Sequence, residues 1–147
     1  YPLPVFFFFF MMGMSSFSTR YIPMTPHPNH TGLKRIVNAF FYSMHGFKAC
    51  FRTEEAFRQE VYLAVVLLPL SFWLGDTAVE HILLLGSVII VFIVELLNTA
   101  VERAIDRISF EKHELSREAK DMGSAAVFMA LVLMGFVWIF IALSKFA

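Results

Sequence analysis

Three segments of the chain are almost free of charged residues, and their lengths predict helices that cross a membrane. The longest runs from Met122 to Ser144 and meets the requirement of about 20 residues for a helix across a hydrocarbon layer. The other two, 61–75 and 82–94, reach that length only if they are extended. The first must take in residues 56–60, and the second must continue past Glu95. The pattern therefore predicts three spans and places Glu95 at or just inside a membrane boundary.

An amphipathic segment precedes the first span. Its apolar residues recur every three or four positions, as on one face of a helix. They are Leu33, Ile36, Val37, Phe40, Phe41, Met44 and Phe47. Polar residues fall mostly off this stripe, which is typical of a helix lying in the membrane interface. Two interpretations remain open at this point: a plain anchor, or a helix that covers an active site.

Residues 1–31 differ from the rest of the chain. The chain begins without methionine, and the phenylalanine run Phe6–Phe10 is too short to span and has no basic segment ahead of it. We therefore do not interpret it as a signal peptide. We expect 1–31 to be a disordered extension or an over-extended reading of the gene, with translation starting at Met24. Residues 32–147 then form one membrane domain.

The composition agrees with a membrane protein, since 58% of the residues are hydrophobic, against about 45–50% in ordinary soluble domains. The 12 basic and 12 acidic residues cancel, and Cys50 is the only cysteine. These values exclude a disordered chain, a typical nucleic-acid-binding protein and a disulfide scaffold. We expect an all-α membrane protein with an interfacial helix followed by three transmembrane helices.

Basic residues are unevenly distributed along this pattern. Eleven of the 12 precede the first span or lie between the second and third, and only Lys145 lies at the opposite end. Because Lys and Arg collect in short cytoplasmic segments, the N-terminus is predicted inside and the C-terminus outside. The loop that carries Asp76 and Glu80 then faces outward.

Four polar residues share one face of the second span. Glu95, Asn98, Glu102 and Asp106 are spaced three or four positions apart, so they follow one another along a helix. Carboxylates at a bilayer boundary cost several kcal/mol unless they are paired, hydrated or bound to a cation. A cation site removes that penalty. Alternatively, Glu102 and Asp106 lie above the membrane and pair with the neighbouring arginines, 103 and 107.

The first and third spans also bring polar groups to this level. They are Glu54, Glu55, Glu60, Lys120, Asp121 and Ser124. Mg²⁺ prefers oxygen ligands, usually one or two carboxylates with nucleotide phosphates and water, so a magnesium nucleotide site is a natural interpretation. The chain has no P-loop and no G-x-G-x-x-G motif, which excludes a soluble kinase of those types. A serine nucleophile elbow and an H-E-x-x-H zinc motif are also missing from the sequence.

Three motifs then carry a resemblance. E-L-L-N-T-A-V-E at 95–102 is followed by A-K-D-M-G-S-A-A-V at 119–127, and F-R-Q-E at 57–60 precedes both. In this order and spacing, they closely resemble the prokaryotic integral-membrane diacylglycerol kinase family, over Gly32 to about Trp138. The resemblance implies a homotrimer in the bacterial inner membrane. It also implies transfer of the γ-phosphate of Mg-ATP to the hydroxyl of diacylglycerol, which yields phosphatidic acid for phospholipid metabolism.

The resemblance also implies roles for individual residues. The catalytic base falls on Glu95, the metal ligands on Glu54 and Glu102, and supporting positions on Glu60 and Asn98. The implied nucleotide contacts are Arg35, Tyr42, Glu54, Glu102, Glu111, His113, Lys120 and Asp121. The implied lipid contacts are Arg35, Gln59, Trp73, Glu95, Ser124 and Trp138. For the two tryptophans, an ordinary aromatic belt at the membrane interface is an equal alternative.

Departures from the family pattern concern the lipid side. Phe40-Phe41 and Met44-His45 in the interfacial segment and His81 in the outer loop replace the family's usual residues, so acyl-chain preference is open. Undecaprenol kinase, from the same superfamily, is the nearest alternative function. A non-catalytic transporter subunit would also place carboxylates in its spans. The role of Asp106, and the subunit that supplies each half of the site, are left undecided.

Overall fold

The computed structural model describes residues 32–108 and 113–147, and these are almost entirely helical. The helices are α2 (Leu33–Thr53), α3 (Glu55–Leu74), α4 (Ala78–Ile108) and α5 (Glu114–Phe146). Within the described ranges no strand is present, so the all-α prediction is confirmed. Residues 1–31, with the predicted start at Met24, lie outside the described residues.

The chain divides into two units, 1–48 and 49–147. The described part of the first unit is most of α2, whose apolar stripe is solvent-exposed and includes an edge-to-face pair of Phe40 and Phe41 with ring centroids 5.9 Å apart. The predicted amphipathic helix is therefore confirmed. Its position in a membrane interface stays a prediction.

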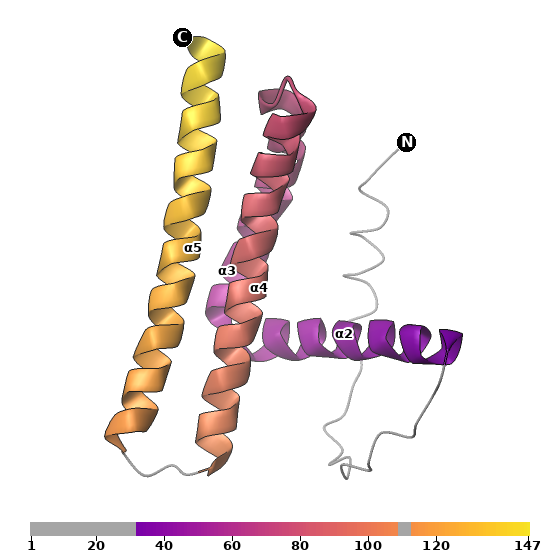
Figure 1. Cartoon of the computed structure of the whole chain (residues 1–147), viewed down its shortest axis with the longest axis vertical. Helices are drawn as coiled ribbons and strands as arrows, with labels where there is room; N and C mark the ends of the chain where they lie inside the picture. The colour runs from indigo at the N-terminus through magenta and orange to yellow at the C-terminus, as the bar shows by residue number, and fades with distance from the viewer. Residues whose placement is uncertain (1–31, 109–112) are drawn as a thin grey trace. The chain divides into compact units, whose positions relative to one another are not determined.

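Three helices of the second unit are long and apolar enough to span a membrane. In this unit α4 packs along α5 and, less extensively, against α3 (Figure 1). At about 1.5 Å per residue, even the 20 residues of α3 cover roughly 30 Å. Pro69 lies inside α3, as membrane helices tolerate. The three predicted spans, including the extension of α4 beyond Glu95, are confirmed as helices of sufficient length.

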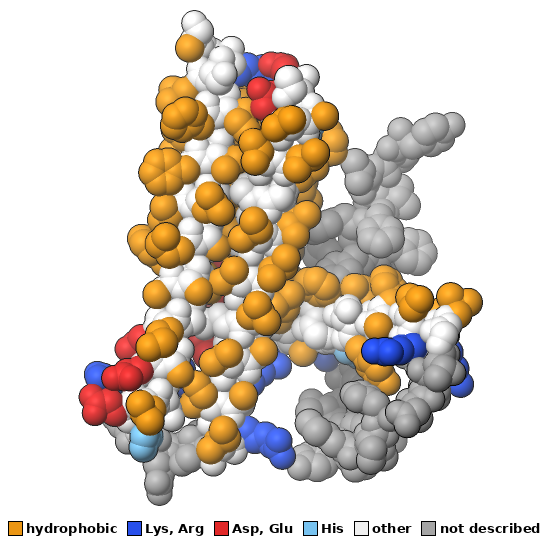
Figure 2. Space-filling view, viewed as in Figure 1, with side chains coloured by type: hydrophobic (Ala, Val, Ile, Leu, Met, Phe, Trp, Pro, Cys, Tyr) orange, Lys and Arg blue, Asp and Glu red, His pale blue; other side chains and the backbone are white. Residues whose placement is uncertain are grey.

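Most large apolar side chains of this unit point outward instead of into a core. A small buried cluster of Leu74, Leu84 and Ile141 lies near one end. Figure 2 shows an apolar face over α4 and α5, with acidic side chains gathered near the start of α5. Exposed apolar surface of this extent suits contact with lipid or with other membrane helices.

The turn between α3 and α4 is tied to the C-terminal end of α5. Glu80 Oε2 accepts hydrogen bonds from the backbone amides of Asp76 (2.7 Å) and Thr77 (3.0 Å), while Thr77 Oγ1 accepts one from the Glu80 amide (3.2 Å), which is a capping box. Lys145 Nζ reaches the same turn and donates to the Trp73 carbonyl (2.8 Å) and to Asp76 Oδ1 (2.9 Å). These contacts fix the end of the bundle opposite the carboxylates of α4.

Candidate active site

The polar face of α4 begins with a buried carboxylate. Glu95 is 4% exposed, and Thr99, one turn further on, is 5% exposed. Asn98, Glu102 and Asp106 are half-buried along the same helix. This side of α4 is therefore covered where it carries Glu95 and becomes more open toward Asp106.

Carboxylates from two further segments lie near Glu95. Glu54, which immediately precedes α3, and Glu102 both repel Glu95 electrostatically, and Glu60 of α3 interacts with it in the same way. Like charges disfavour one another unless a cation or a proton is shared among them. Glu54, Glu60 and Glu102 thus each act electrostatically on Glu95 within one chain, and their roles as base and metal ligands stay predictions.

Glu54 forms the joint between α2 and α3. Its backbone is extended at φ −101° and ψ 120°, and its side chain makes no capping hydrogen bond to α3. The carboxylate turns instead toward Thr53, whose Oγ1 lies 2.9 Å from Glu54 Oε1, and toward Arg103, whose Nη2 lies 3.6 Å from the same oxygen. The side chain is thus available to the site and not used to cap its own helix.

Asn98 of α4 lies at the contact between α4 and α5. Its Nδ2 donates to Glu102 Oε1 at 3.2 Å, whereas its Oδ1 is buried without a hydrogen-bond partner. A Cβ atom at Gly123 of α5 would collide with this Oδ1. Glycine is therefore what allows the α5 backbone to approach Asn98 so closely, and the packing orients the amide toward Glu102.

Lys120 pairs with Asp106 across the α4–α5 contact. Lys120 Nζ lies 2.6 Å from Asp106 Oδ1, with side chains 37% and 49% exposed. The alternative in which Glu102 and Asp106 pair with the neighbouring arginines is wrong for Asp106, because α5 brings Lys120 against it. Of those arginines, Arg103 reaches Glu54 instead. Sequence reasoning had left Asp106 without a role, and the structure makes it the partner of Lys120.

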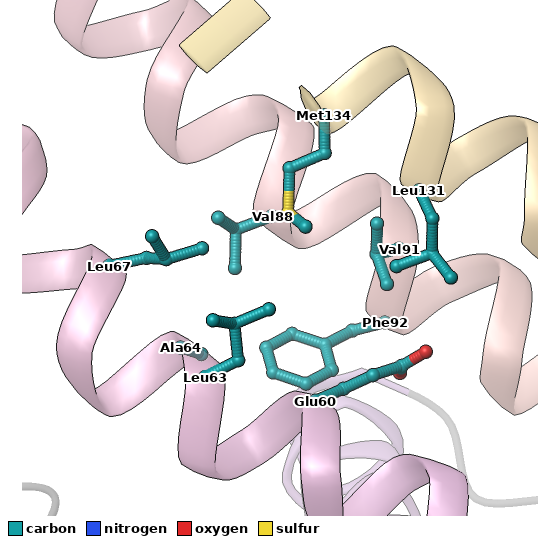
Figure 3. A pocket seen from close by; sticks show the side chains of 9 residues that line it. All are labelled: Glu60, Leu63, Ala64, Leu67, Val88, Val91, Phe92, Leu131 and Met134. Atoms are coloured by element: carbon teal, nitrogen blue, oxygen red, sulfur yellow. The ribbon is translucent and has the colours of Figure 1, made fainter. Parts of the chain in front are cut away.

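A small pocket of about 10 Å³, room for about one water molecule, is bounded at one end by Glu60 (Figure 3). It is lined by apolar side chains of α3, α4 and α5 together with this one carboxylate. The lining residues are Glu60, Leu63, Ala64, Leu67, Val88, Val91, Phe92, Leu131 and Met134. Glu60 Oε2 is buried without a hydrogen-bond partner. The pocket therefore combines apolar walls with one carboxylate, and it is too small to hold a lipid.

The remaining predicted lipid contacts are divided between the two ends of the bundle. Gln59 and Ser124 are exposed on α3 and α5. Trp73 is 60% exposed beside Lys145, whose Nζ is 5.6 Å from its ring centroid, and Trp138 packs on the cluster around Leu84. The structure does not bring the tryptophans to the carboxylates, and their contact with lipid stays a prediction beside the aromatic-belt alternative.

The predicted nucleotide contacts are only partly within the described bundle. Arg35 and Tyr42 belong to the first unit, where both are exposed. Glu111 lies outside the described residues. His113 begins α5, where its Nδ1 accepts a hydrogen bond from the Leu115 amide at 3.3 Å, and Asp121 is exposed one residue after Lys120.

Sequence reasoning missed the contacts that join α2 to α4. Cys50 Sγ lies 3.5 Å from Thr99 Oγ1, and burial raises the pKa of the Cys50 thiol, an effect that the hydrogen bond to Thr99 partly offsets. Arg103 Nη2 donates to the Ala49 carbonyl at 3.4 Å and also contacts Thr53 Oγ1. No motif marks these pairs. The one sequence feature that could have indicated them is the position of Arg103, a cation directly after the predicted ligand Glu102.

Comparison with known proteins agrees with the motifs and the geometry. The sequence profile of the family described as prokaryotic diacylglycerol kinase matches residues 41–142. The chain is 53% identical over 108 residues to a diacylglycerol kinase of Haemophilus influenzae, covering 74% of this chain and 92% of that protein. It is 51% identical over 117 residues to one of Pseudomonas aeruginosa (78% and 95%) and 44% identical over 118 residues to one of Escherichia coli (80% and 97%).

These matches cover nearly the whole of each relative, and the profile's range, 41–142, includes Glu54, Glu60, Glu95 and Glu102. A profile that covers more than half of the chain, with relatives above 40% identity, leaves one assignment. The chain belongs to the prokaryotic diacylglycerol kinase family.

Proposed function

We propose that this protein phosphorylates diacylglycerol to phosphatidic acid with ATP, at the cytoplasmic face of the bacterial inner membrane. The observation that carries the proposal is the buried carboxylate of Glu95, on which Glu54, Glu60 and Glu102 act electrostatically, beside exposed apolar side chains of α3, α4 and α5. A lipid alcohol requires this combination, because its hydroxyl must reach a base while its chains stay in apolar surroundings.

Phosphoryl transfer asks the protein mainly for positioning and charge neutralisation. Glu95 accepts the proton of the lipid hydroxyl as the hydroxyl oxygen bonds to the γ-phosphorus. The bond from that phosphorus to the β,γ-bridging oxygen breaks, and ADP leaves. Lys120, held by Asp106, faces the phosphates as a positive charge.

Mg²⁺ fits the donor set of Glu54 and Glu102. Among residues 32–108 and 113–147, no cluster of three or more acidic, histidine or cysteine ligands is present. Mg²⁺ is commonly held by one or two carboxylates plus substrate phosphates and water, so two glutamates suffice. When bound with ATP, the ion would neutralise charge on the transferred phosphoryl group.

The assembly is proposed to be a homotrimer with its N-terminus cytoplasmic and its C-terminus periplasmic. The distribution of basic residues supports the orientation. The broad apolar faces of α4 and α5 support helix packing between subunits (Figure 2). Arg35, Tyr42 and the 111–113 segment are proposed to complete the nucleotide site.

The test is phosphorylation by purified protein in detergent or vesicles, with γ-labelled ATP and either diacylglycerol or undecaprenol, with and without Mg²⁺. We expect labelled phosphatidic acid that depends on Mg²⁺. Glu95→Gln should lower kcat by about 10²–10⁴-fold, as expected for loss of a general base. Glu114→Gln, the same change at a glutamate whose side chain is 77% exposed, is the matched control and should retain activity. Labelling of undecaprenol alone would assign the alternative substrate, and full activity in Glu95→Gln would refute the base.

A further inference from the structure

We infer that Arg103 is a positioning residue that orients Glu54 for the metal ion, a role that rests on the proposed function. Arg103 lies on α4 directly after Glu102, and it is 44% exposed at its side chain. Its guanidinium reaches away from its own helix to the joint between α2 and α3. It thereby connects the two segments that carry the proposed metal ligands.

One nitrogen of Arg103 makes all of these contacts. Nη2 is 3.6 Å from Glu54 Oε1, 3.4 Å from the Ala49 carbonyl and in contact with Thr53 Oγ1. The group therefore binds the last turn of α2 and the carboxylate that follows it at the same time. An arginine that merely balanced charge at the surface would have no reason to bind the backbone of another helix.

Thr53 completes the arrangement. Its hydroxyl accepts from Arg103 and has one hydrogen to donate, with Glu54 Oε1 at 2.9 Å and the Ala49 carbonyl at 3.1 Å as the two acceptors. The carboxylate is the charged and the nearer acceptor, so the hydroxyl hydrogen favours Glu54 Oε1. Both contacts to the carboxylate then fall on Oε1, which leaves Oε2 without a contact to Arg103 or Thr53.

The absence of a capping bond makes this support necessary. Glu54 occupies the position before the first turn of α3, where a side chain ordinarily accepts from the helix amides, and it makes no such bond. Without Arg103 and Thr53, the carboxylate could rotate toward the first turn of α3, as an ordinary cap does, and leave the site. Outer contacts of this kind usually affect metal affinity by about 10–100-fold.

A second effect of Arg103 acts in the opposite direction, and the experiment distinguishes the two. A positive charge near a metal ligand repels the cation, so removal of Arg103 could tighten metal binding. We expect orientation to dominate, because the pair is half-exposed and 3.6 Å long and its charge is therefore screened.

The experiment titrates purified protein with Mn²⁺, followed by electron paramagnetic resonance, in the presence of a non-hydrolysable ATP analogue. Arg103→Ala should weaken Mn²⁺ binding by about tenfold, and Arg103→Lys should restore most of the affinity because one nitrogen makes all the contacts. Thr53→Val should weaken binding in the same direction. Arg107→Ala, which removes the same charge one turn further along α4, should leave binding unchanged. Circular dichroism checks that each variant is folded.

Lipid phosphorylation is then measured against Mg²⁺ concentration. Arg103→Ala should raise the Mg²⁺ concentration for half-maximal rate and change kcat at saturating Mg²⁺ by much less. Equal Mn²⁺ affinities for Arg103→Ala and Arg107→Ala, tighter binding in Arg103→Ala, or no Mn²⁺ binding by the unaltered protein would each overturn the inference. Intact, Arg103-dependent Mn²⁺ binding without lipid phosphorylation would refute the proposed function alone.

Discussion

Replacing Gly123 with alanine should disturb Asn98 across the contact between α4 and α5. The added Cβ would collide with Asn98 Oδ1, which is already buried. Either the helices separate or the amide rotates, and rotation breaks its hydrogen bond to Glu102, now 3.2 Å long. A change at Gly123 therefore affects the proposed metal ligand Glu102 through Asn98.

The size of the effect of Gly123→Ala follows from the usual cost of overpacking. Overpacking by one methyl group in a close contact costs about 1–3 kcal/mol. At about 1.4 kcal/mol per factor of ten, that corresponds to roughly a 5- to 150-fold loss if it falls entirely on the active conformation. Asn98→Ala removes the colliding group, so Gly123→Ala should cost much less in that background. The coupling between the two changes should be about 1–3 kcal/mol.

The assay is a double-mutant cycle on kcat/KM for lipid phosphorylation, with thermal stability measured in parallel. Gly135→Ala on the same helix is the control, because an added Cβ there meets nothing within 4 Å. Additive losses for Gly123→Ala and Asn98→Ala, or an effect of Gly123→Ala no larger than that of Gly135→Ala, would contradict the reasoning.

Three further outcomes are expected. Asp106→Asn should raise KM for ATP several-fold with a smaller change in kcat, because Lys120 loses the partner that holds it 2.6 Å away; an unchanged KM would remove Lys120 from the nucleotide site. Lys145→Met should lower the free energy of unfolding by about 1 kcal/mol while preserving kcat, since hydrogen bonds of a charged group to the turn are lost far from the carboxylates. Cys50 should react slowly with iodoacetamide at pH 8 in the folded protein and rapidly once unfolded, because its raised pKa lowers the thiolate fraction in the folded state; equal rates would show an accessible thiol.

The helices could be predicted from the sequence more completely than the contacts between them. Hydrophobic length and the position of Glu95 sufficed to extend the second span, and α4 indeed runs from Ala78 to Ile108. Spacing alone placed Asn98 and Glu102 on the same side of α4. These features depend on one helix at a time, so local periodicity determines them.

The pairing of charges depends on how the helices are rotated against one another, which periodicity does not specify. Arg103 could have paired with Glu102 or with Asp106, its neighbours on α4, and only the packing directs it to Glu54. In the same way, Lys120 meets Asp106 because α5 crosses α4 at that level. The close approach at Gly123 likewise has no sequence signal beyond the glycine itself.

The joint at Glu54 limits how this chain can change in length. The Glu54 amide donates to the Cys50 carbonyl at 2.8 Å and its carbonyl accepts from Arg58 at 3.3 Å, so the last bond of α2 and the first of α3 share one residue. An inserted residue adds up to about 3.8 Å of chain, and here it would displace the carboxylate from Arg103. Insertions and deletions should therefore be tolerated at the outer turn near Gly75 and rejected between Thr53 and Glu55, a contrast that a scan of single-residue insertions would reveal.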